Sequence, residues 1–211
     1  MHALSEANGS LIPSSNCLNI VQNVEFRRYR TRRRSRALPH LVDNPDMSIA
    51  GPILITGGAG MLAHAFRETC NSRGIESHLV TRADCDITNV AQILTVMDQY
   101  NPSTVINCAA YTKVDLAEKE KDAALTINGK AVGFVAEACR RRSLTLVHFS
   151  TDYVFDGSIR RPLRPADPLK PKSMYGISKL LGEQMLQEFA PPRWLILRTA
   201  WLYGPDGHNF L

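Results

Sequence analysis

The sequence has no hydrophobic run close to the roughly 20 residues that a membrane-spanning helix requires, so no membrane association is predicted. Its five cysteines are odd in number and include no C-x-x-C pair, which argues against a disulfide framework or a zinc ribbon and favours a reducing, cytoplasmic location. The six histidines show no ligand spacing, so no metal site is predicted. With 44% hydrophobic and 21% charged residues among 211, the chain is expected to fold as a globular domain.

The net charge of +5 is concentrated near the N-terminus. Residues 1–50 contain seven arginines and four acidic residues, whereas residues 51–211 contain 18 basic and 16 acidic side chains. We therefore interpret residues 1–46 as a disordered, Arg-rich tail and do not expect nucleic-acid binding. A targeting segment and a polyanion-binding patch are the alternatives, and translation starting at Met47 would make the tail an artefact.

From Ile53 onwards, short apolar runs alternate with longer segments of helical periodicity. This alternation predicts an α/β domain over residues 47–211, with a doubly wound parallel sheet of the Rossmann type, because parallel strands require crossover connections. The predicted strands are residues 53–56, 77–81, 104–107, 144–149 and 194–198, and the predicted helices are residues 60–71, 90–100, 123–140 and 173–189.

A glycine-rich turn follows the first predicted strand and leads into a helix, with the sequence Thr-Gly-Gly-Ala-Gly-Met-Leu-Ala over residues 56–63. In such a turn, glycines at positions 57 and 60 let backbone N–H groups approach a pyrophosphate, and the helix N-terminus adds unpaired donors. A tight turn with no ligand is the structural alternative. The strand before and the helix after favour a dinucleotide site that includes Gly57, Gly60, Met61 and Leu62.

Tyr175 and Lys179 form a Tyr-x-x-x-Lys pair at the start of a predicted helix, so both side chains share one face. A phenol with an ordinary pKa near 10 transfers protons poorly at neutral pH, and a neighbouring ammonium is expected to lower that pKa. An isolated pair of this kind is often a surface pair. This one follows Ser150-Thr151-Asp152-Tyr153, where a predicted strand ends at the ligand-binding edge of the sheet.

The spacing of Gly57, Gly60 and Ala63 as T-G-x-x-G-x-x-[GA] resembles the extended branch of the short-chain dehydrogenase/reductase superfamily. At the end of the second strand the sequence offers Arg82 where an acidic residue would bind the ribose of NAD. A guanidinium suits a 2′-phosphate, so NADPH is the predicted cofactor, while the nearby Asp84 keeps NADH as the alternative. By resemblance, Asp86 and Ile87 lie against the adenine.

Four segments resemble the dTDP-4-dehydrorhamnose reductase family: residues 105–115, 148–157, 175–183 and 197–204. The resemblance implies NADPH-dependent reduction of the C4 keto group of dTDP-4-dehydro-L-rhamnose to dTDP-L-rhamnose. It implies that Tyr175 is the acid, that Lys179 holds the nicotinamide ribose, that Thr151 binds the carbonyl oxygen and that Asn128 holds a relay water. It further implies that the cofactor is lined by Ala109, Ala110 and Tyr111, and that the sugar faces Asp152, Tyr153 and Trp201.

The sequence departs from the family at its C-terminal end, because most of the substrate-binding lobe is expected to be absent after Leu211. A catalytically idle NAD(P)-binding relative, acting as a binding or regulatory subunit, is therefore one alternative, and another sugar-nucleotide reductase or epimerase is the second. A homodimer is the candidate assembly. Simpler interpretations also exist for Thr151 as a turn cap, Asn128 as a helix-surface residue and Trp201 as a core residue.

Overall fold

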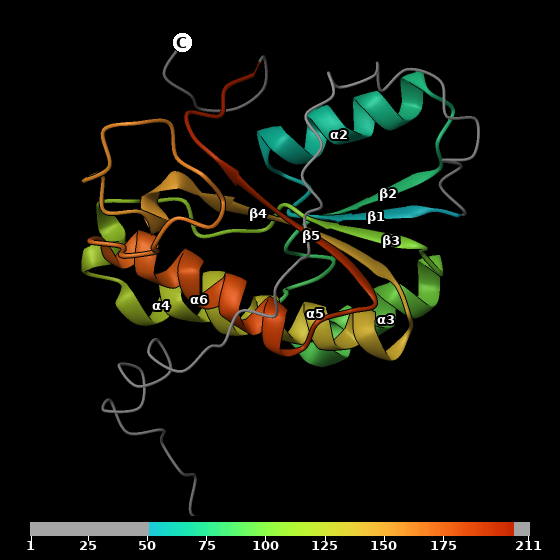
Figure 1. Ribbon diagram of the computed structural model, residues 1–211. Helices are drawn as coiled ribbons and strands as arrows, with labels where there is room; N and C mark the ends of the chain where they lie inside the picture. The colour runs from blue at the N-terminus through green and yellow to red at the C-terminus, as the bar shows by residue number, and fades with distance from the viewer. Residues whose placement is uncertain (1–50, 205–211) are drawn as a thin grey trace, which may run out of the picture. The chain divides into compact units, whose positions relative to one another are not determined.

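The computed structural model describes residues 51–204, and these residues form one parallel sheet with helices on both faces (Figure 1). The predictions about the Arg-rich tail and about Met47 lie outside the described residues. The five strands are β1 (Ile53–Thr56), β2 (Ser77–Val80), β3 (Thr104–Asn107), β4 (Thr145–Thr151) and β5 (Arg193–Thr199). All five were predicted from the sequence, and β1 and β3 have the predicted bounds.

The strands lie in the order β2-β1-β3-β4-β5, and every neighbouring pair is parallel. The chain runs outward from β1 to β2 and then crosses back to β3 on the other side of β1. Open α/β sheets bind ligands at such a reversal of strand order, beyond the carboxyl ends of the strands. The topology therefore places the ends of β1 and β3 side by side, with Thr56 in register with Asn107.

Helix α2 (Met61–Ser72) covers one face of the sheet, while α3 (Val90–Tyr100), α5 (Ala131–Arg141) and α6 (Met174–Glu188) cover the other (Figure 1). Alternate residues of each strand point to opposite faces, so Ile55 packs in the core beneath α2 while Leu54 packs in the larger core against α3, α5 and α6.

The sequence explains where α3 begins and ends. The Asn89 side chain accepts hydrogen bonds from the Ala91 and Gln92 N–H groups, and Asn101 ends the helix in the left-handed conformation.

The single helix predicted for residues 123–140 is wrong in detail. The structure has α4 (Lys121–Leu125), a π-helical segment η2 (Thr126–Lys130) and then α5. Helix α6 packs closely on η2 at two glycines. A Cβ at Gly182 would collide with the Asn128 backbone carbonyl oxygen, and a Cβ at Gly129 would collide with the Leu181 side chain. Hydrophobic periodicity over 18 residues cannot reveal one wide turn, since the flanking residues keep a helical pattern.

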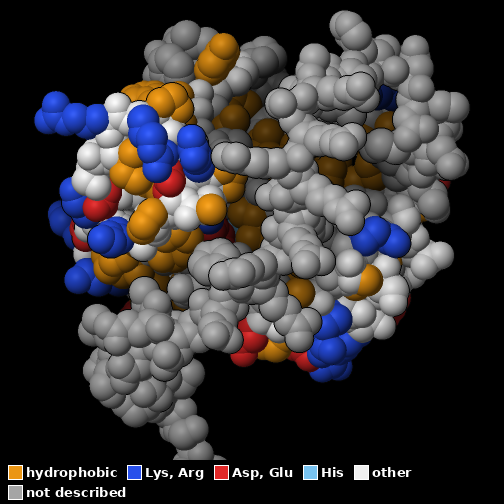
Figure 2. All heavy atoms as spheres, viewed as in Figure 1, with side chains coloured by type: hydrophobic (Ala, Val, Ile, Leu, Met, Phe, Trp, Pro, Cys, Tyr) orange, Lys and Arg blue, Asp and Glu red, His pale blue; other side chains and the backbone are white. Residues whose placement is uncertain are grey.

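Strand β5 forms the edge of the described sheet and is poorly covered. It pairs only with β4, and apolar side chains on both of its faces reach the surface, with exposed fractions of 42% for Trp194 and 49% for Leu195. Figure 2, viewed from the same side, shows hydrophobic side chains at the surface bordered by Lys and Arg. Parallel sheets are normally covered on both faces, so β5 has surface that suits further protein structure. Within residues 51–204, no helix is both long and apolar enough to cross a membrane.

Candidate active site

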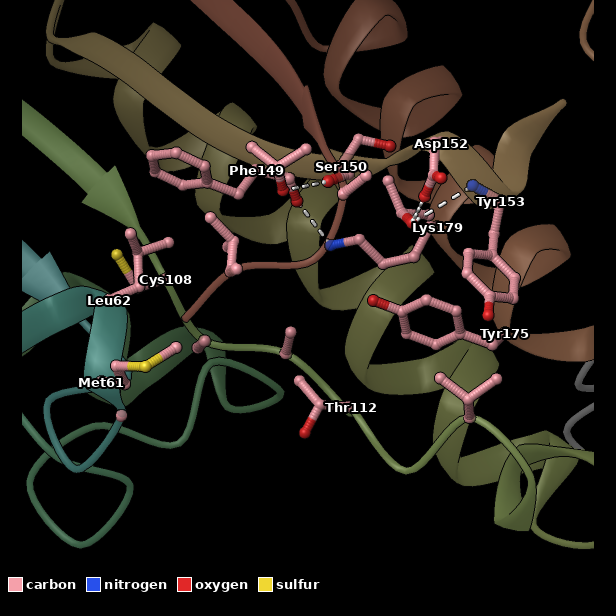
Figure 3. Close-up of a pocket in the computed structure, with 18 of the residues that line it drawn as sticks. Met61, Leu62, Cys108, Thr112, Phe149, Ser150, Asp152, Tyr153, Tyr175 and Lys179 are labelled. Atoms are coloured by element: carbon pink, nitrogen blue, oxygen red, sulfur yellow. Dashed lines mark hydrogen bonds between the residues drawn. The ribbon is translucent and has the colours of Figure 1, made fainter. Parts of the chain in front are cut away.

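A pocket of about 550 Å³ opens at the carboxyl ends of β1, β3, β4 and β5 (Figure 3). It is bounded by the glycine-rich turn and the start of α2 on one side and by the start of α6 on the other. Eleven of the residues predicted as site residues line it: Gly60, Met61, Leu62, Ala109, Ala110, Thr151, Asp152, Tyr153, Tyr175, Lys179 and Trp201. The structure thus brings together segments that are more than 100 residues apart in the sequence.

The turn after β1 requires glycine at position 57. Its φ of +71° lies in the left-handed region, and a Cβ there would be 2.6 Å from the Ala109 backbone nitrogen. The turn therefore lies directly against the segment that follows β3. Helix α2 begins at this turn with no side-chain cap at Gly60 and no acidic residue in its first turn. Its first N–H groups and the positive end of its dipole are therefore available to an anionic group.

Tyr175 lies in the first turn of α6, which is capped by the Ser173 side chain through a 3.1 Å hydrogen bond from the Gly176 N–H. Its hydroxyl points toward the middle of the pocket, opposite Met61 and Leu62 (Figure 3). Burial raises the pKa of Tyr175, and the charge of Asp152 raises it further, while an interaction with the Thr151 hydroxyl opposes both. The phenol is therefore protonated at neutral pH.

Lys179 is 3% exposed, and its Nζ donates a 2.6 Å hydrogen bond to the carbonyl oxygen of Phe149 at the end of β4. Burial lowers the pKa of Lys179 to about 8, although the carboxylate of Glu183 acts in the opposite direction. The expectation that the ammonium lowers the pKa of Tyr175 is wrong for this structure. Burial has the largest effect on the pKa of the Tyr175 phenol and raises it.

Thr151, Asp152 and Tyr153 lie where β4 runs into a short 3₁₀ turn. The Thr151 hydroxyl accepts a 3.2 Å hydrogen bond from the Tyr153 N–H and donates a 3.0 Å bond to the Asp152 carboxylate. The interpretation of Thr151 as a turn cap is thus correct, but the same residue also lines the pocket and acts on Tyr175. Tyr153 packs edge-on against the Tyr175 ring with centroids 5.8 Å apart. This contact restricts the orientation of the phenol.

Two predicted residues, Tyr111 and Asn128, lie behind the pocket wall rather than in it. The Asn128 amide is 1% exposed and holds the Tyr111 backbone on both sides, with hydrogen bonds of 2.8 Å from its N–H and 2.9 Å to its carbonyl oxygen. The interpretation of Asn128 as a helix-surface residue is therefore wrong. The Tyr111 hydroxyl donates a 2.7 Å hydrogen bond to the Glu120 carboxylate.

The residues predicted to bind the adenosine end lie apart from the pocket, at the end of β2. The Arg82 side chain is 78% exposed, and its Nε donates a 3.1 Å hydrogen bond to Asp86. The Asp84 carboxylate accepts hydrogen bonds from both the N–H and the hydroxyl of Thr81, at 2.8 and 2.7 Å. Asp84 is therefore already engaged within its own turn. Ile87 is 4% exposed and packs in the core.

Trp201 is not a core residue. Its side chain is 76% exposed, it lines the pocket mouth, and its φ of +54° is unusual for a bulky residue. A bulky side chain in the left-handed region costs on the order of 1–3 kcal/mol and is often found at ligand sites. The conformation is consistent with the predicted place of Trp201 at the sugar.

Sequence reasoning missed several residues of the site. Cys108 lines the pocket, and burial raises the pKa of its thiol to about 12. Ser178 is fully buried and joins Asn128 to the Tyr175 backbone. Glu183 and Arg198 form a bidentate ion pair behind Lys179. A polar residue inside an apolar helical face was the only available signal for Ser178 and Glu183.

A glycine turn at the strand-order reversal of a parallel sheet, facing a buried lysine and a phenol, defines a doubly wound α/β protein of the Rossmann type. The pocket offers hydroxyl donors to a carbonyl oxygen and unpaired backbone donors to a phosphate. The pattern of the RmlD substrate binding domain family matches residues 51–211, and the chain belongs to this family.

The chain is similar to named relatives. It is 44% identical to dTDP-4-keto-6-deoxy-D-glucose reductase of Streptomyces niveus, over 75% of this chain and 55% of that protein. Among solved structures, dTDP-4-dehydrorhamnose reductase of Clostridium acetobutylicum is 40% identical with a TM-score of 0.72, covering 75% of this chain and 56% of that one. The Bacillus anthracis dTDP-4-dehydrorhamnose reductase, crystallised with NADP, is 39% identical with a TM-score of 0.70, covering 76% and 57%. The chain thus spans about half the length of the relatives it matches.

Proposed function

We propose that this chain provides the cofactor-binding and proton-donating half of an NADPH-dependent sugar-nucleotide reductase. The reaction is reduction of the C4 keto group of dTDP-4-dehydro-L-rhamnose to dTDP-L-rhamnose. The observation that carries the proposal is that Tyr175, Lys179 and Thr151 share one pocket with the uncapped N-terminus of α2. The names of the Clostridium and Bacillus relatives support the choice of substrate.

The residues present fit a dinucleotide phosphate cofactor. The absence of a side-chain cap at α2 leaves backbone donors for a pyrophosphate, and glycine at position 57 leaves room for close approach. Arg82 would hold the 2′-phosphate, while Oδ2 of the Asp84 carboxylate accepts hydrogen bonds from the N–H and the hydroxyl of Thr81. Asp86 would border the adenine next to the buried Ile87. Ala109 and Ala110 would form the wall beside the nicotinamide, with Tyr111 behind it. The cofactor supplies hydride.

The chain's own residues would handle the proton. The Tyr175 hydroxyl would donate a hydrogen bond to the ketone oxygen, which orients and polarises it. The Thr151 hydroxyl donates to Asp152 in this structure and would turn from that carboxylate to donate a second bond. The raised pKa of Tyr175 keeps its proton available until negative charge develops on that oxygen. Lys179, one helical turn further along α6, is held by the Phe149 carbonyl and would hold the nicotinamide ribose. Asp152, Tyr153 and Trp201 would contact the sugar.

A second substrate is favoured by one observation. The Streptomyces niveus relative, 44% identical, is named for reduction of dTDP-4-keto-6-deoxy-D-glucose. The two substrate names share the dTDP group and a carbonyl at C4, so the same donors at Thr151 and Tyr175 would serve both. A related keto sugar is therefore the alternative substrate.

The experiment has two parts that fail separately. First, fluorescence titration of the purified chain with NADPH and NADH tests the cofactor site, and absence of binding to either would reject it. Second, oxidation of NADPH in the presence of each keto sugar nucleotide is measured for the chain and for Tyr175→Phe. The proposal expects turnover that the substitution reduces by at least about 100-fold. Equal rates in both proteins would remove Tyr175 as the acid.

A further inference from the structure

Four connected hydrogen bonds run behind the pocket and link the backbone of Tyr111 to the backbone of Tyr175. The Asn128 amide accepts from the Tyr111 N–H at 2.8 Å and donates to the Tyr111 carbonyl oxygen at 2.9 Å. The same amide nitrogen donates to the Ser178 hydroxyl at 3.0 Å, and that hydroxyl donates to the Tyr175 carbonyl oxygen at 2.7 Å. These hydrogen bonds thereby join the segment after β3, the π-helical segment η2 and helix α6.

The two side chains that make these hydrogen bonds are buried, and all of their donors are used. Asn128 is 1% exposed and Ser178 is 0% exposed, so water does not compete for their bonds. Both N–H donors of the amide and the single donor of the hydroxyl have partners. Removal of one member would leave a buried donor without an acceptor, which is more costly than losing an exposed hydrogen bond.

The two ends of these hydrogen bonds are the backbone of Tyr111, behind the pocket wall, and the backbone of Tyr175, whose phenol faces the pocket. Tyr111 directly follows Ala109 and Ala110, which line the pocket, and Tyr175 lines it from the start of α6. Helix α6 is also pressed on η2 at Gly182, where no side chain would fit against the Asn128 carbonyl oxygen. Asn128 and Ser178 thus hold the backbone of Tyr175 at a fixed position relative to residues 109–111.

We propose that Ser178 is a positioning residue, which sets the place of the Tyr175 phenol relative to residues 109–111 by joining the Asn128 amide to the Tyr175 carbonyl. The inference rests on the proposed function, since it assigns Tyr175 to the reacting oxygen. Ser178 itself does not line the pocket, so it acts only through its two partners. The residue must carry a hydroxyl, because the site requires one group that accepts from an amide and donates to a carbonyl.

The first test needs no turnover. The variants are Ser178→Ala, Ser178→Thr, which keeps the hydroxyl, and Gln187→Ala, a control at an exposed position of the same helix. In NMR spectra of the chain, the ring signals of Tyr175 and the amide signal of Tyr111 are expected to shift together in Ser178→Ala, to return toward wild type in Ser178→Thr and to stay unchanged in Gln187→Ala. Unchanged Tyr175 and Tyr111 signals in folded Ser178→Ala would overturn the inference. If Ser178→Ala does not fold, Asn128→Asp breaks the same link from the other side and is expected to move the same Tyr175 ring signals.

The second test is kinetic and separates this inference from the proposed function. Ser178→Ala is expected to lower kcat about 10- to 100-fold, since small misplacements of a reacting group have effects of this size. KM and the Kd for NADPH should change less than about threefold, and Ser178→Thr should recover most of kcat. In a Tyr175→Phe background, Ser178→Ala should add almost nothing. Full additivity there would show that Ser178 does not act through Tyr175, whereas equal rates of wild type and Tyr175→Phe would instead reject the proposed function.

Discussion

Replacement of Gly57 by alanine separates the general cost of a left-handed backbone from the specific cost of filling the turn. Gly57 and Gly74 have similar positive φ values, +71° and +64°. An L-residue in that region costs about 1–2 kcal/mol, so both Gly57→Ala and Gly74→Ala should show this loss. Nothing lies within 4 Å of a Cβ at Gly74, which makes Gly74→Ala the matched control.

At Gly57 the structure adds a second cost. A Cβ there would be 2.6 Å from the Ala109 nitrogen and 2.7 Å from the Cys108 carbonyl carbon, both of which are backbone atoms. The segment after β3 must therefore move, and overpacking of this kind costs about 1–3 kcal/mol. The free energy of unfolding should fall by about 2–5 kcal/mol in Gly57→Ala.

Chemical denaturation measures this difference, and fluorescence titration with NADPH measures its consequence for the site. Because the displaced segment lines the pocket, Gly57→Ala is expected to weaken NADPH binding at least about tenfold, whereas Gly74→Ala should bind as wild type does. Equal stabilities and equal affinities in the two variants would refute the argument from backbone contact.

Three further outcomes follow from charges in the structure. The pKa of Lys179 is lowered to about 8 by burial, so above that pH the folded chain holds fewer protons than the unfolded chain, whose lysine has the ordinary pKa of 10.5. Unfolding free energy should therefore rise by about 3 kcal/mol between pH 8 and 10.5 relative to Lys179→Met, and parallel pH profiles would contradict this. Arg82→Ala should weaken NADPH binding about tenfold while leaving NADH binding unchanged, and equal losses for both cofactors in titrations would exclude the 2′-phosphate contact. Glu183→Gln or Arg198→Met alone should cost about 3–5 kcal/mol in chemical denaturation because a buried charge loses its partner; the double variant should cost less than the sum, and strict additivity would count against the pair.

The local parts of the fold were predictable from residue patterns. Strand β1 reads as an unbroken apolar run because it is buried on both faces, and the bounds of α3 follow from its periodicity and its asparagine caps. The glycine turn was also predictable, because the need for a positive φ at Gly57 belongs to the turn itself. The four-residue spacing of Tyr175 and Lys179 places them one turn apart on a helix, whatever the position of that helix in the fold.

The tertiary structure decided what depends on contacts between distant segments. The π-helical turn at Asn128 and the close approach of Gly182 arise where η2 meets α6, and the hydrogen-bond chain through Ser178 exists only because of that packing. The pKa of Tyr175 rises rather than falls because burial and the charge of Asp152, which no spacing rule contains, outweigh the interaction with the Thr151 hydroxyl. Periodicity and backbone conformation are properties of a few consecutive residues, whereas burial and hydrogen-bond partners depend on which segments the sheet order brings side by side.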